Sequence, residues 1–146
     1  MEGWRSRPFG AGAAADGPYL RPMSTATQVF GELGERIAER WLRRQGWRIM
    51  HRRFRNGRRD IDLVASQGGT VAFVEVKARR GEAFGDPVEA VHWRKRRELV
   101  RSAQVWIDRH GKADERYRFD VVGVLFDAGR VRVRHVQDAF GLPPDA

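Results

Sequence analysis

The sequence FVEVKAR, residues 73–79, places two charged side chains inside the most apolar run of the chain. Successive side chains of a strand point to opposite faces, so Glu75 and Lys77 share one face and Val74 and Val76 share the other. As an ion pair at an exposed strand end they would contribute only about 0–1 kcal/mol, and a buried pair is often no better than apolar residues. The pattern favours a strand that carries chemistry, with the ion pair as the alternative.

A second carboxylate precedes this strand. Asp62 lies in IDLVA, residues 61–65, and twelve residues separate it from Glu75 across the turn SQGG at 66–69. Two carboxylates on adjacent strands can share a divalent cation, and Mg²⁺ prefers oxygen ligands while keeping several waters. Lys77 can hold the attacking water or stabilise charge on a scissile phosphate. The spacing therefore predicts that Asp62 and Glu75 bind Mg²⁺ or Mn²⁺, with Lys77 as a catalytic group.

Two helices and five strands are expected around this hairpin. An apolar stripe predicts a first helix that ends at Gly46, and Asp86 with Pro87 and Glu89 is typical of the start of a second helix that runs to about His110. The expected elements are a helix at 28–45, strands at 47–54, 61–65 and 71–78, a helix at 86–110, and strands at 117–126 and 130–136. The order αβββαββ predicts an α/β domain with a mixed central sheet flanked by helices. Trp93 and Trp106 of the second helix are expected in the core, with a role as base-stacking platforms as the alternative.

The flanking segments and the composition indicate how the chain is divided and which classes of protein are excluded. Residues 1–25 mix Gly, Ala, Pro and Arg without periodicity and are expected to be a disordered extension, unless translation starts at Met23. Residues 26–140 are expected to form one domain, followed by a short tail at 141–146. The chain has no cysteine, which excludes disulfides and thiolate metal sites and fits a cytoplasmic protein. No apolar run approaches the roughly 20 residues that cross a membrane.

The net charge of +9 indicates a polyanionic partner, for which nucleic acid is the first candidate. Most of the basic residues are Arg, so a GC-rich genome could also produce this charge. Arginines crowd the segment before Asp62, where a nucleic-acid backbone would present its phosphates to a metal ion. The expected phosphate contacts from this segment and the second helix are Arg53, Arg55, Arg58, Arg59 and Lys95. The four histidines are scattered and form no convincing zinc set.

The first helix carries three candidate acids. At about 100° per residue, Glu35 lies on the flank of the apolar stripe, whereas Glu32 and Glu39 lie nearly opposite the core. Glu35 is therefore the helix carboxylate expected to reach the site, although a surface ion pair would also explain it. Asp60 shares a strand face with Asp62 and is interpreted as a solvated strand end rather than an outer ligand.

Five fragments in this order resemble a known family. GELGERIAERWL, DIDLVA, FVEVKAR, FGDPVEAV and RFDVVGV resemble the YraN family of bacterial proteins, which is similar to archaeal Holliday junction resolvases. The hairpin resembles that of the PD-(D/E)XK nuclease superfamily, with Ile61 in place of the proline. The resemblance implies a restriction-endonuclease-like core in which Glu35 acts on the metal, if necessary through water, and Arg36 meets phosphate. By analogy with resolvases it also implies a homodimer.

The expected function is a metal-dependent endonuclease that hydrolyses phosphodiester bonds in DNA, including branched or structured DNA. Its catalytic residues would be Glu35, Asp62, Glu75 and Lys77. Two other classes stay open. A protein that keeps the nuclease fold could bind nucleic acid without cleaving it, and a basic structural protein could bind an acidic protein partner.

Overall fold

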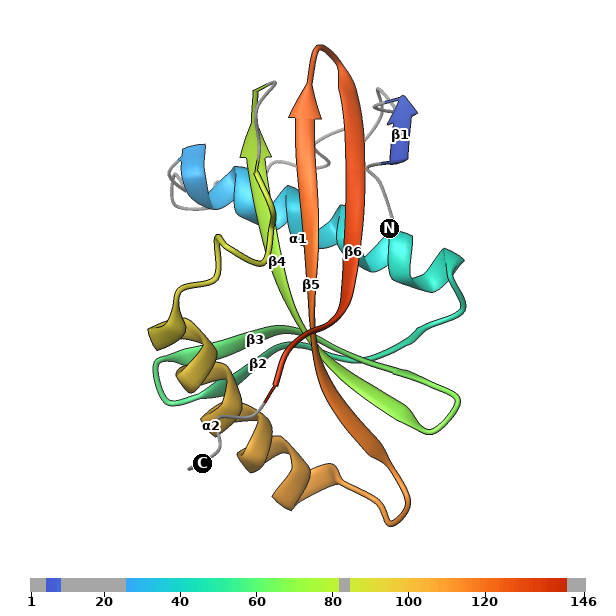
Figure 1. Ribbon diagram of the computed structural model, residues 1–146, viewed down its shortest axis with the longest axis vertical. Coiled ribbons are helices and arrows are strands. Elements are labelled where there is room, and N and C mark those ends of the chain that lie inside the picture. Colours follow the sequence, from blue (N-terminus) through green and yellow to red (C-terminus); the bar gives the residue numbers. More distant parts are fainter. Residues whose placement is uncertain (1–4, 9–25, 82–84, 142–146) are drawn as a thin grey trace, which may run out of the picture.

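The computed structural model describes residues 5–8, 26–81 and 85–141, without the side chains of 5–8 and Arg59. Its elements form one mixed sheet with two helices (Figure 1). They are β1 (Arg5–Pro8), α1 (Ala26–Arg44), β2 (Arg48–Asn56), β3 (Arg59–Gln67), β4 (Thr70–Arg80), α2 (Trp93–His110), β5 (Arg116–Asp127) and β6 (Arg130–Phe140). The α/β class and the order αβββαββ are confirmed, with the additional strand β1 ahead of them.

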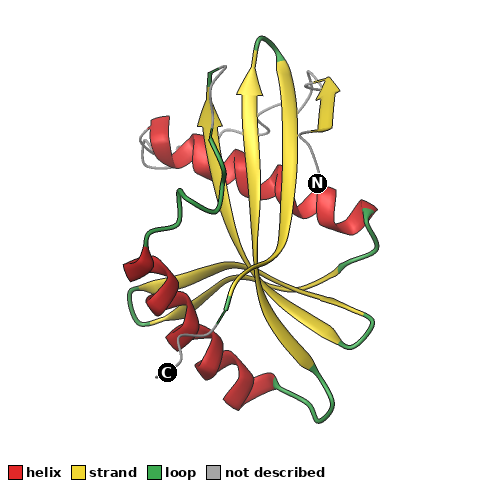
Figure 2. Cartoon of the chain, in the orientation of Figure 1, coloured by secondary structure: helices red, strands yellow, loops and turns green. Residues whose placement is uncertain are grey.

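The six strands lie in the order β1-β6-β5-β4-β3-β2. Only β4 and β5 run parallel; every other neighbouring pair is antiparallel. A parallel pair needs a long crossover, which α2 supplies between β4 and β5. In Figure 2 the strands fan out from the middle of the sheet, as strongly twisted strands do.

The two helices bury opposite faces of the sheet. Residues of α1 pack with alternate residues of the strands in one apolar cluster, and residues of α2 pack with the intervening ones in a second. Val74 and Val76 belong with the α1 cluster, whereas Phe73 belongs with the α2 cluster. The faces assigned to FVEVKAR from strand alternation are therefore confirmed, and Glu75 and Lys77 fall on the α2 face.

Glycine lets α1 lie directly on β4. A side chain at Gly34 would place its Cβ 2.7 Å from the Cβ of Ala78, closer than real Cβ atoms approach. The helix ends as expected at Gly46, whose φ of 92° is left-handed and lets the next N–H groups bond back to the last turn. Gly34 thus allows the close contact between α1 and β4, and Gly46 ends the helix. Gly34 immediately precedes Glu35, so this contact also positions Glu35.

The second helix starts later than predicted. Residues 87–90 form a separate turn with i to i+3 bonds, and α2 begins only at Trp93. Asp86 does act as a cap, because its Oδ1 accepts the N–H of Val88 at 2.9 Å, but it caps that turn. Arg96 donates to the carbonyls of Val88 and Val91 at 2.9 Å, which ties the turn to α2 without helical continuity.

The two tryptophans of α2 have different environments. Trp106 is fully buried and its indole N–H donates to His51 Nδ1 at 2.8 Å, so its core position is confirmed. Trp93 is 57% exposed, so the expectation that it packs in the core is wrong. It is the first residue of α2 and belongs to neither apolar cluster.

The ends of the chain are described only in part. The expected disordered extension at 1–25 lies outside the described residues except for β1, which pairs with β6 from Arg5 to Pro8. The sequence of this segment, RSRP, shows no apolar alternation. Its described contact is backbone pairing, which sequence patterns of this kind do not reveal. Of the expected tail at 141–146, only Gly141 is described. Neither helix in the described part of the chain is long and apolar enough to span a bilayer.

Candidate metal and nucleic-acid site

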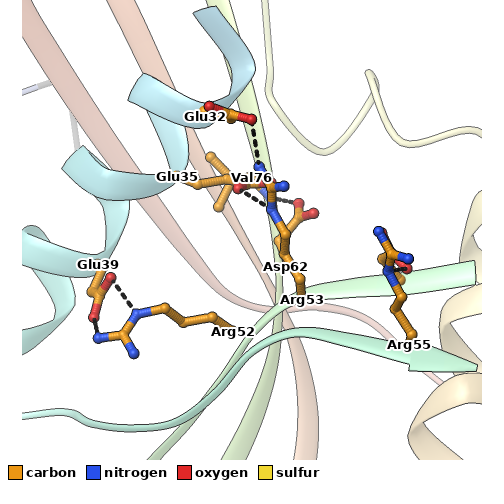
Figure 3. A network of polar contacts seen from close by, with 9 residues as sticks. Glu32, Glu35, Glu39, Arg52, Arg53, Arg55, Asp62 and Val76 are labelled. Carbon is orange, nitrogen blue, oxygen red and sulfur yellow. Dashed lines mark hydrogen bonds and ion pairs between the residues drawn. The ribbon is translucent and has the colours of Figure 1, made fainter. Parts of the chain in front are cut away.

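Strands β3 and β4 separate beside Asp62. Their pairing runs from the turn as far as Leu63 and Val74. One residue further along β3, the Asp62 Oδ2 atom accepts the backbone N–H of Val76 at 2.8 Å (Figure 3). A side chain thus takes the place of a backbone acceptor, so the Asp62 carboxylate lies at the opening between the two strands.

Glu75 lies in β4 beside this opening and is 4% exposed. Its Oε1 atom is 3.5 Å from Nζ of Lys77, while Oε2 has no hydrogen-bond partner among the described residues. A buried carboxylate oxygen without a partner costs free energy. The ion pair with Lys77 therefore accounts for only one oxygen of this carboxylate, and the other group that interacts with Glu75 at close range is the Asp62 carboxyl.

Burial raises the proton affinity of both carboxylates, and their interaction adds to the rise at Asp62 but opposes it at Glu75. Burial first, and then the charge of Glu75, raise the pKa of Asp62 to about 7. Burial likewise raises the pKa of Glu75, while the ammonium groups of Lys95 and Lys77 oppose the rise. Lys95 also lowers the pKa of Asp62, so this residue of α2 acts on both carboxylates from the opposite element. The electrostatic environment of the predicted metal ligands thus includes a basic residue of α2.

A hollow of about 280 Å³ opens on the α1 side of Asp62. Its walls come from α1, β2 and β3 and consist of Glu32, Glu35, Arg36, Glu39, Arg52, Arg53, Asp62 and Leu63. The expectation that Glu32 and Glu39 point away from the site is wrong. Residues spaced by three and four share one helix face, and β2 closes over that face (Figure 3).

Arg53 occupies the place beside Glu35. Its Nε donates to Glu35 at 3.0 Å, and its guanidinium lies 3.5 Å from Glu32. Burial and the charge of Asp62 raise the pKa of Glu35 to about 7, and Arg53 opposes this rise. Arg53 has a φ of 47°, a conformation that is uncommon for any residue except glycine and is often found at functional sites. Its backbone thus turns the side chain from the strand toward the acids.

Replacement of Arg53 tests whether this guanidinium competes with a cation. In Arg53→Gly the left-handed backbone is relieved and Glu35 loses its partner, so we expect affinity for Mn²⁺ to rise by up to about fivefold, the equivalent of 0–1 kcal/mol. Calorimetric titration measures it.

The neighbouring Arg52 supplies the control. It pairs with Glu39 in the same hollow, with its Nε at 2.9 Å, but it makes no described contact with Glu35. Arg52→Ala should leave the titration unchanged. Equal affinities in all three proteins would show that Arg53 does not compete for the site.

The donor chemistry of the site fits a hard divalent cation. Glu35, Asp62 and Glu75 offer carboxylate oxygens, and one oxygen of Glu75 is unpaired. In the described conformation, no three acidic or imidazole groups within residues 26–81 and 85–141 already form a ligand set. In this conformation Glu35 accepts a hydrogen bond from Arg53, and Asp62 accepts one from the N–H of Val76.

The other predicted residues lie around the β2–β3 turn. Arg55 is 74% exposed on its side chain and lies 3.7 Å from Asp60, as expected for a solvated strand end. Arg58 is exposed in the turn, and the side chain of Arg59 is outside the described part. The structure therefore gathers Arg36, Arg53 and Lys95 at the carboxylates, and leaves Arg55 and Arg58 on the neighbouring hairpin.

Sequence patterns missed the contact between Arg53 and Glu35. The residue was assigned to phosphate binding because it is one of many arginines, and a left-handed backbone at a non-glycine residue has no reliable sequence signal. The role of Gly34 could have been inferred, since a glycine within a helix lowers its stability and often marks close packing.

Comparison with known proteins agrees with the resemblance. The model of the uncharacterised protein family UPF0102 matches residues 34–124. A UPF0102 protein of Symbiobacterium thermophilum is 47% identical over 75% of this chain and 94% of its own length. Those of Anaeromyxobacter dehalogenans and Alkaliphilus metalliredigens are 40% and 39% identical, over 90% and 78% of this chain and 91% and 99% of their own lengths. The chain therefore belongs to the UPF0102 family, the YraN family that its motifs predicted.

Proposed function

We propose that this protein is a nuclease that uses Mg²⁺ or Mn²⁺ to hydrolyse phosphodiester bonds in DNA. The observation that carries the proposal is the buried Glu75, whose Oε2 atom has no hydrogen-bond donor, with the Asp62 carboxyl next to it and the charges of Lys77 and Lys95 acting on it. A protein that only needed stability would gain more from apolar residues at these positions. Glu35 and Asp62, which line the hollow, have raised pKa values, as acids of functional sites often do.

Each side chain has a role that follows from its place. Asp62 and Glu75 would hold the metal ion, and Glu35 would join them directly or through water. The bound ion would supply an activated water and polarise the phosphate. Lys77 and Lys95 would balance the negative charge that develops on the phosphate. Glu35, with a pKa of about 7, suits the transfer of a proton near neutral pH.

Cleavage assays test the proposal directly. Linear and branched DNA are incubated with the protein and Mg²⁺ or Mn²⁺, and EDTA provides the control. We expect cleavage that EDTA abolishes. Binding without cleavage under all these conditions would favour the other function, a protein that binds nucleic acid through the same fold. In that case the contact between Arg53 and Glu35 would belong to a permanently closed site.

The hairpin arginines are expected to contact phosphates. Because each phosphate contact releases counterions, affinity for DNA should fall steeply with salt, and Arg55→Ala with Arg58→Ala should flatten the slope of log K against log salt by about one to two units. Fluorescence anisotropy across a salt series measures this slope.

A double variant of equal charge provides the control. Arg109 and Arg116 are also exposed, and Arg116 pairs with Thr70 at the far end of β4. Arg109→Ala with Arg116→Ala should retain the original slope. If the hairpin variant behaves like this control, the β2–β3 turn is not part of the interface.

A further inference from the structure

Trp93, the first residue of α2, exposes a large aromatic surface. It is one of two large apolar side chains that are exposed among the described residues, the other being Val29 of α1. Burial of a side chain of this size contributes several kcal/mol, so the exposed indole forgoes much of that gain. Its position on α2 is not set by packing into either apolar cluster.

Two arginines accompany the indole ring. The guanidinium carbons of Arg94 and Arg97 lie 5.5 and 5.6 Å from the ring centroid, within the range of cation–π contacts. Trp93 is nevertheless 57% exposed, so the arginines leave much of the ring open. An open aromatic face with two cations beside it matches the chemistry of a base with its flanking phosphates.

We propose that Trp93 is a stacking platform for an unpaired base, and that Arg94 and Arg97 contact the phosphates next to it. This inference rests on the proposed function and narrows the substrate class to nucleic acids with unpaired bases, such as flaps, branches or single strands. In a fully paired duplex the bases are stacked on each other and cannot reach the indole. The platform carries no base preference, because every base has a π-face.

The test compares three fluorescein-labelled ligands in EDTA by anisotropy. They are a single-stranded oligonucleotide, the same strand with abasic sites in place of its central nucleosides, and a blunt duplex. The wild-type protein should bind the strand with bases about 5- to 100-fold more tightly than the abasic strand. Trp93→Leu should lose this preference, keep the salt slope and bind the duplex as well as the wild type does.

Two further variants separate stacking from loss of fold or apolar surface. Trp93→Phe keeps an aromatic face and should retain most of the preference, whereas Val29→Ala removes the other exposed apolar side chain and should change nothing. Thermal melts of all variants should coincide, since Trp93 is not a core residue.

The outcomes distinguish this inference from the proposed function. If Trp93→Leu keeps the wild-type preference for bases while DNA binding and cleavage are intact, Trp93 is not a stacking platform and the proposed function stands. If the wild-type protein binds neither strand nor duplex, both are wrong.

Discussion

Glu75→Gln should abolish divalent-metal binding and DNA cleavage while leaving DNA binding intact or improved. Gln keeps the shape of the side chain but removes the charge that a hard cation requires, and the metal ion supplies several kcal/mol of transition-state stabilisation. A loss of 4 kcal/mol corresponds to a rate reduction of about 1000-fold. Calorimetric titration with Mn²⁺ and a cleavage assay with Mg²⁺ measure the two effects, and without metal the variant should be at least as stable as the wild type.

Lys77→Met is the matched variant on the same strand face. It removes the ammonium 3.5 Å from Glu75 but spares the carboxylate ligands. We expect metal binding to persist and the cleavage rate to fall by about 100-fold, as for removal of one charge-stabilising donor. If the pair were only a salt bridge, both variants would lose stability and neither would change the metal titration. That result would overturn the metal site.

The fold could be predicted because local patterns and long-range packing agree through most of the chain. Val71 to Val76 alternates between two buried faces, and the Gly68-Gly69 turn adopts positive φ values of 56° and 79°, which suit a tight hairpin. The expected turn and the element order followed from these residues. Strand ends were predicted one to a few residues too short, since pairing continues where apolar alternation stops.

The start of α2 could not be predicted from its capping residues. Asp86, Pro87 and Glu89 match a helix start, and they do form a turn. The Arg96 side chain then donates hydrogen bonds to the carbonyls of Val88 and Val91. These carbonyls are therefore satisfied although the helix is interrupted between the turn and α2. That side chain lies several residues further along, so a local pattern does not reveal it. Trp93, which was expected well inside the helix, is instead its exposed first residue.

The candidate site was predicted where it depends on strand geometry. Asp62 and Glu75 directly adjoin the last paired residues of the hairpin, Leu63 and Val74. Lys77 shares a strand face with Glu75, so the hairpin register and strand alternation predict the proximity of all three side chains. Glu32 and Glu39 were misplaced because the helix was considered against the core alone, while β2 also covers α1. The position of Arg53 depends on a single backbone conformation, which sequence spacing does not encode.

The buried Asp120 and the partly buried Asp62 distinguish a structural position from a functional one. Asp120 in β5 accepts hydrogen bonds from Arg118 at 3.0 and 3.1 Å and from the N–H of Asp138 at 2.9 Å, and lies 2.7 Å from Nε2 of His135. Burial alone would raise the pKa of Asp120, yet these partners hold it below its ordinary value. Asp62 has one backbone donor and a neighbouring carboxylate, and its pKa rises to about 7.

Asp120→Asn should therefore lower the free energy of unfolding by about 3 kcal/mol, because it leaves the buried His135 and Arg118 without their anion. Arg118 is 23% exposed on its side chain and can recover some hydration, which places the loss at the low end for a buried ion pair. Urea unfolding in EDTA at pH 8 measures it. Arg118→Gln should show a smaller loss, since His135 and Asp138 still bond to Asp120.

Asp62→Asn should have the opposite effect in EDTA, with a gain on the order of 1–2 kcal/mol at pH 8. Asn still accepts the N–H of Val76, and the repulsion with Glu75 is gone. The folded pKa of Asp62 lies above its ordinary value of 3.8, so the folded wild type holds a proton that the unfolded chain releases, and its stability falls as pH rises from about 4 to 7. The gain of Asp62→Asn should accordingly be full above pH 7 and shrink toward pH 4. A loss of stability at pH 8, like that of Asp120→Asn, would assign Asp62 to the structure and remove it from the metal site.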